Sequence, residues 1–100
     1  MRPYRPFEAC AFGPVPPTSR PHIPTVTGLP KLVVVSSTGD PVAPYQSATN
    51  LARAPGATLV TYEGIQHGSF LDGVTCVDEP VLNYLLELTP PQEGLRCPTR

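Results

Sequence analysis

The sequence predicts an α/β fold in which a strand, a helix, a strand and a helix follow one another, with a proline-rich irregular arm before them. Two continuous β-branched runs, at residues 31–37 and 57–62, indicate the strands. Apolar residues at helical spacing after each run indicate the helices. A strand, helix and strand in succession imply a right-handed crossover, so we expect the two strands to be parallel.

Prolines divide the chain into two parts. Eight of the fifteen prolines lie within residues 1–30, and each one fixes its own φ and disfavours helix in the residue before it. We therefore expect an irregular arm over residues 1–30 and an α/β segment over residues 31–100.

The first strand and helix follow directly from the local sequence. The run KLVVVSS, residues 31–37, is typical of a strand buried on both faces of a parallel sheet. A turn at residues 38–41 ends it, and Pro44 suits the first turn of a helix over residues 45–54. Pro55 and Gly56 end that helix.

The second half of the unit repeats this order. Residues 57–62 form the second strand, bounded by Gly64, and a long loop follows. The last helix is expected over residues 76–88, with a tail of irregular structure after Pro90 and Pro91. We expect its apolar stripe to be core: Val77, Val81, Leu82, Leu85 and Leu86.

Two parallel strands alone leave an unpaired edge on each strand, and a two-stranded sheet is marginal in water. A larger parallel sheet, to which this unit adds its last two strands, is the natural completion. The sequence therefore predicts a missing partner, either another part of the same fold or a second copy of the chain.

Composition excludes several classes of function. The net charge is −1 and the seven Lys and Arg residues are scattered, which gives no reason to expect a nucleic acid partner. No apolar stretch approaches the roughly 20 residues of a membrane span. The N-terminus has no apolar core of a signal peptide, so the chain as written would stay in the cytoplasm. The cysteines and histidines lie at no zinc-binding spacing, and we expect no metal and no cofactor.

The chemistry of the chain centres on one carboxylate and one imidazole. Asp40 follows the first strand and His67 follows the second, so in a parallel sheet both loops open at the same edge. A carboxylate that accepts from Nδ1–H of an imidazole prepares its Nε2 to take a proton from a serine. Taken singly, Asp40 before a proline is a common turn residue, and His67 beside a glycine is a common loop residue.

The nucleophile of such a triad is absent from the sequence. Chain order in α/β-hydrolases is serine, acid, histidine, so the serine is expected upstream of Asp40, but no G-x-S-x-G occurs anywhere. None of the five serines fits a nucleophile elbow. We therefore expect the isolated chain to be inactive.

Residues 37–45, 64–68 and 76–86 together resemble the C-terminal domain of tripeptidyl aminopeptidase-like (TAP-like) serine proteases, which are exported bacterial α/β-hydrolases. The resemblance covers roughly residues 10–97. It implies that Asp40 is the triad acid, that His67 is the base, and that Cys76 and Cys97 form a disulfide. Ser37, Ala43 and Gly13 depart from the family pattern, which usually has Gly, Thr and Trp there.

By this resemblance the chain is a C-terminal segment of a serine hydrolase or peptidase, whose partner is the serine-bearing portion or a second copy, and whose full-length relatives act on peptides or esters. Three cysteines leave one thiol over, and Cys10 would be that thiol. The alternative for the cysteines is three buried thiols in a reducing cytosol. The alternative functions are a non-catalytic remnant or binding module that offers an exposed strand edge, and a small disulfide-bonded structural protein.

Overall fold

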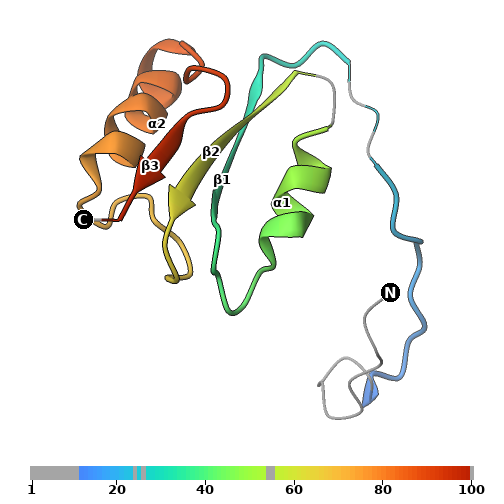
Figure 1. The fold of residues 1–100 in the computed structure, drawn as a ribbon. Coiled ribbons are helices and arrows are strands. Elements are labelled where there is room, and N and C mark those ends of the chain that lie inside the picture. Colours follow the sequence, from blue (N-terminus) through green and yellow to red (C-terminus); the bar gives the residue numbers. More distant parts are fainter. Residues whose placement is uncertain (1–11, 24, 26, 54–55, 100) are drawn as a thin grey trace.

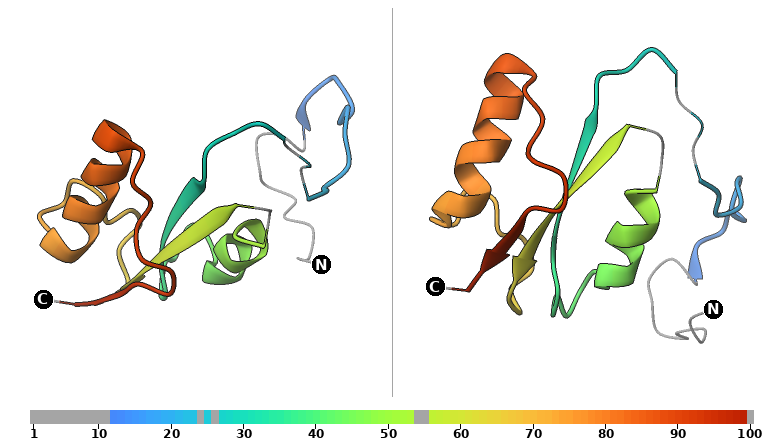
Figure 2. Two further views of the ribbon diagram at one scale, coloured as in Figure 1. Left: turned by 90° about the horizontal axis from the view of Figure 1, so that it is seen from above. Right: turned by 45° about the horizontal axis from the view of Figure 1, so that its top comes forward.

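The computed structural model describes residues 12–23, 25, 27–53 and 56–99. A parallel sheet of three strands, in the order β1-β2-β3, lies between two helices (Figure 1). The helices α1 and α2 cover opposite faces of this sheet, as two further views also show (Figure 2). The described residues of the range 12–30 form no α-helix or β-strand and are exposed.

The two expected strands are present and parallel. β1 (Leu32–Ser37) pairs with β2 (Ala57–Glu63) in a register that sets Leu32 opposite Ala57 and Ser37 opposite Tyr62. β1 is less buried than its sequence predicts, because only Ser37 is buried and the other residues are half-buried or exposed. Its outer edge has no strand partner in the described part of the chain.

The short helix α1 (Tyr45–Leu51) begins after Pro44 as predicted but ends sooner. Hydrogen bonds from Ala52 and Arg53 to carbonyls within the last turn close it, and Ala54 and Pro55 lie outside the described residues. On the face of β2 that α1 covers, the Tyr45 hydroxyl lies 2.6 Å from the Thr61 hydroxyl oxygen and hydrogen-bonds with it. This bond connects the start of α1 to the middle strand.

The long helix α2 (Thr75–Glu87) ends at Leu88, whose left-handed φ of 56° closes the helix with an N–H bond to the Tyr84 carbonyl. Val77 and Val81 pack on the sheet as expected. The expectation that the whole apolar stripe is core is wrong, because a three-stranded sheet covers only one side of α2. Three leucines of the stripe are 39%, 59% and 79% exposed: Leu82, Leu85 and Leu86.

A third strand, β3 (Arg96–Pro98), lies where we expected only an irregular tail. It runs parallel to β2 and sets Cys97 opposite Tyr62, so β2 has a partner on both edges. A disulfide joins Cys97, which is fully buried, to Cys76 in the first turn of α2. The bridge therefore attaches β3 to the helix that packs on the same sheet. Cys10, the expected spare thiol, lies outside the described residues.

The core is small and lies between the sheet and α2. Six side chains form it: Val60, Tyr62, Val74, Val77, Val81 and Cys97. A half cystine is thus one of six core members, and the bridge contributes to both packing and chain connectivity. Neither helix of the described residues has the length and apolar character that crossing a bilayer requires.

Reduction of the disulfide is expected to destabilise the chain. The bridged cysteines are 21 residues apart, and closing a loop of that size stabilises a fold by roughly 3 kcal/mol on the chain-entropy model. Urea unfolding of a Cys10→Ser variant, with and without reductant, measures the difference. A second variant, Cys10→Ser with Cys97→Ser, should unfold alike in both conditions, and equal stability of all four samples would contradict the expectation.

Candidate active site

Asp40 lies in the turn after β1 and is fixed by the backbone around it. Its Oδ1 accepts hydrogen bonds from the backbone N–H groups of Val42, at 2.8 Å, and Ala43, at 2.9 Å. The side chain is only 5% exposed. The Ala43 N–H is the largest influence that lowers the pKa of the Asp40 carboxyl below its usual value; the Val42 N–H and His67 act in the same direction, and burial opposes them.

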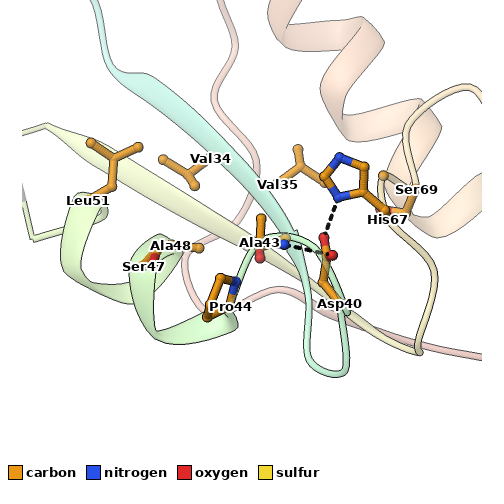
Figure 3. A pocket seen from close by; sticks show the side chains of 12 residues that line it. Val34, Val35, Asp40, Ala43, Pro44, Ser47, Ala48, Leu51, His67 and Ser69 are labelled. Carbon is orange, nitrogen blue, oxygen red and sulfur yellow. Dashed lines mark hydrogen bonds and ion pairs between the residues drawn. The ribbon is translucent and has the colours of Figure 1, made fainter. Parts of the chain in front are cut away.

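His67 lies in the loop between β2 and α2, where its ring meets the other oxygen of the same carboxylate. His67 Nδ1 and Asp40 Oδ2 are 2.8 Å apart. An ionised carboxylate can only accept, so Nδ1 carries the proton and donates it. The other ring nitrogen points away from Asp40 (Figure 3), and the His67 side chain is 58% exposed.

Two glycines allow the loops that carry Asp40 and His67 to approach. The Gly39 N–H donates to the Gly64 carbonyl at 2.8 Å. A Cβ on Gly39 would lie 3.1 Å from the Gly64 oxygen and 3.1 Å from Cγ2 of Ile65, which is tighter than ordinary packing. Glycine at position 39 therefore sets the distance between the two loops.

A hollow of about 280 Å³ lies beside this pair, between β1 and α1. Its walls are mostly apolar, and Asp40 and His67 stand at one end of it (Figure 3). The Ser69 hydroxyl, in a side chain that is 1% exposed, also belongs to its wall and has no hydrogen-bond partner among the described residues. The wall residues from β1 and α1 include Val34, Val35, Ala48 and Leu51.

The structure thus brings together the two residues that the sequence selected from separate loops. No serine in the described part of the chain is hydrogen-bonded to His67. Within that part, no group of three or more His, Cys, Asp and Glu side chains could hold a metal ion. The arrangement is an acid-base pair, which can orient an imidazole and stabilise its cation.

A parallel α/β sheet with a carboxylate and an imidazole joined at its carboxyl edge is the arrangement of an α/β-hydrolase. Comparison with known families gives the same class. Residues 2–97 match the family model described as TAP-like protein. The chain therefore belongs to the TAP-like family of α/β-hydrolases, as its resemblance predicted.

Curated relatives come from mycobacteria. Carboxylesterase B of Mycobacterium tuberculosis is 50% identical over 92 residues. Serine protease Hip1 of the same species is 45% identical over 92 residues. In both comparisons the match covers 92% of this chain and 18% of the relative, so the chain spans less than a fifth of the length of these relatives.

Sequence reasoning missed the contacts that hold the His67 loop in shape. The Gln66 side chain bonds to Gly68 and to Asp72, and the Asp78 carboxylate accepts from the Leu71 N–H. No motif signals these bonds, because each depends on how a loop side chain turns. A glycine close to the end of each strand was visible in the sequence and could have indicated the close approach at Gly39.

The pH dependence of Asp40 follows from its lowered pKa. A folded-state pKa below that of the unfolded chain stabilises the folded chain above about pH 4, and this stabilisation is lost as pH falls through the folded pKa. A ¹³C NMR titration of the Asp40 carboxyl should have its midpoint below 3.8. The stability difference between wild type and Asp40→Asn should shrink over the same range, and a midpoint at or above that value would contradict the expected effect of the backbone N–H donors.

Proposed function

We propose that this chain supplies the acid, Asp40, and the base, His67, of a Ser-His-Asp triad in a serine hydrolase of peptides or esters. The observation that carries the proposal is the 2.8 Å bond between His67 Nδ1 and Asp40 Oδ2 at the carboxyl edge of the sheet. The nucleophile belongs to a segment outside this sequence, since no G-x-S-x-G occurs in it.

Each part of the pair has a defined task in that reaction. Asp40 is held by two backbone N–H groups, so its second oxygen is fixed where it can orient the ring. His67 then presents Nε2, which takes the proton of the serine hydroxyl during attack and returns it to the leaving group. The carboxylate stabilises the imidazolium between these two transfers.

The chain alone is expected to hydrolyse little. The serine and the oxyanion hole together account for most of the rate of such enzymes, and neither is assigned to any residue here. The length of the relatives leaves room for both, because the match covers 18% of Carboxylesterase B and of Serine protease Hip1. The names of these two relatives suggest an ester or a peptide as substrate.

The surface of the fold supports assembly with a serine-bearing portion. The outer edge of β1 is unpaired among the described residues, and the apolar hollow lies beside it. An added strand would satisfy the backbone groups of β1 and would stand next to Asp40 and His67. The arm of residues 1–30 is a separate part in this proposal, and its His22 and Ile23 line a second hollow together with residues of α1.

The disulfide suggests where the assembled enzyme works. Bridges persist in oxidising compartments and are rare in the cytosol, so we place the assembled enzyme outside the cytoplasm.

A second candidate function uses the same edge without catalysis. In that case the chain is a binding module whose unpaired β1 edge accepts a strand of a partner. The two candidates differ in one respect: the binding module needs the edge of β1 but does not need His67.

A complementation assay distinguishes the triad from the binding module. The chain is mixed with a separately expressed serine-bearing portion of Carboxylesterase B, and hydrolysis of a nitrophenyl ester is followed. Hydrolysis should appear on mixing and should fall by at least about 10³-fold with His67→Ala, because triad members act as a unit. His22→Ala is the matched control, since the one hydrogen bond of this exposed histidine among the described residues is to the Arg20 carbonyl, and it should leave the rate unchanged.

Two results would count against the triad. If mixing restores no hydrolysis although gel filtration shows a complex, the chain is a binding module. Equal rates for His67→Ala and wild type would exclude His67 as the base.

A further inference from the structure

Packing does little to orient His67. The side chain of His67 is 58% exposed, and Ile65, two residues earlier, is 82% exposed. Gly68, which follows it, has a left-handed φ of 82° and adds no side chain. The bond from Asp40 restrains one ring atom, Nδ1, and the buried Ser69 follows two residues later, so the residues next to His67 decide how its backbone is held.

The side chain of Gln66 provides that restraint. Its Nε2 donates to the Gly68 carbonyl at 3.1 Å and to Asp72 Oδ2 at 2.6 Å. A primary amide nitrogen has two protons, and both are used here. The bond to the Gly68 carbonyl joins residue 66 to residue 68 and therefore spans the backbone of His67. The bond to Asp72 attaches this short span to the next turn of the loop, at residues 71 and 72.

That next turn is itself attached to α2. Leu71 has a φ of 65°, which is costly for a residue with a Cβ, and its side chain is exposed, so packing does not explain the conformation. Its N–H donates to Asp78 Oδ1 at 2.8 Å, in the first turn of α2. The neighbouring Val77 is fully buried, so the loop is connected to a helix that packs in the core.

We propose that Gln66 is a positioning residue for His67, and that the bonds from Gln66 to Asp72 and from Leu71 to Asp78 connect the catalytic imidazole to α2. This inference rests on the proposed function for its catalytic meaning. It predicts that removing the two donors of Gln66 loosens the His67 backbone and weakens the bond from Nδ1 to Asp40 while the core stays intact.

The tautomer of the His67 ring reports on the bond from Nδ1 to Asp40, and measuring it requires no substrate. Neutral imidazole is protonated on either nitrogen, and the Asp40 carboxylate favours the Nδ1–H form. Long-range ¹H–¹⁵N NMR at about pH 9, above the range in which imidazoles titrate, measures the ratio of the two forms. Methyl signals of Val60 and Val77 report in the same samples whether the core is folded.

Gln66→Glu removes both donors and places a carboxylate beside Asp72. The ratio of Nδ1–H to Nε2–H at His67 should fall by roughly fivefold, the factor that corresponds to an ordinary hydrogen bond. Gln66→Met, which has a similar shape and no charge, should act in the same direction and serves if the first variant does not fold. Adding Asp72→Asn to Gln66→Glu returns a donor to this pair and should recover part of the ratio.

Gln46→Glu is the matched control. Gln46 is also a glutamine whose Nε2 bonds to two side chains, Thr49 and Asn50, but it lies on the exposed side of α1. Its substitution should change the His67 ratio by less than about twofold. Equal ratios in Gln66→Met, Gln66→Glu and Gln46→Glu, with the core folded, would overturn the proposal.

The enzyme formed by mixing the chain with the serine-bearing portion provides a second test. Gln66→Glu should lower kcat by roughly 10-fold to 100-fold with little change in KM, because a displaced base affects the chemical step. If the tautomer ratio responds but mixing restores no hydrolysis, the positioning of His67 stands and the proposed function fails. If hydrolysis is restored and neither kcat nor the ratio responds to the loss of Gln66, the function stands and the positioning role is wrong.

Discussion

The parallel pairing of β1 with β2 is the constraint on which the rest of the molecule depends. Parallel strands bring their carboxyl ends to one edge of the sheet, so the turn at Asp40 and the loop at His67 begin side by side. The bond from the Gly39 N–H to the Gly64 carbonyl continues that pairing beyond the strands. A register shift of one residue would turn alternate side chains of β2 away from α2 and would also part the two loops.

Asp40 shows that a turn residue and a candidate catalytic residue can be the same side chain. One carboxylate oxygen forms the turn by accepting two backbone N–H groups, and the other accepts from His67. The interpretation of Asp40 as a turn residue is therefore correct, and the turn also fixes the carboxylate oxygen that faces the ring. The structural interpretation and the functional one support each other here.

Local sequence could predict the elements whose signals are strong. β1, β2, the start of α1 and the pair Asp40 and His67 follow from β-branched runs, a proline at a helix start and the edge rule for parallel sheets. β3 could not be predicted, because three residues that include Pro98 carry no alternation and pair only through the register of β2. The bond of Gln66 to Asp72 depends on side-chain orientation in a loop, which sequence patterns do not encode.

The exposed apolar surface and the small core have a common physical cause. A three-stranded sheet offers α2 only enough area to bury Val77 and Val81, so Leu85 and Leu86 stay in water. Because so little packing is available, hydrogen bonds and one disulfide fix the geometry of the site. They restrain Asp40 and His67 unequally. The carboxylate of Asp40 is held by its own turn, whereas the imidazole of His67 depends on a loop connected to the core through the start of α2. On the positioning that we propose, His67 is therefore the part of the pair more sensitive to changes outside the site.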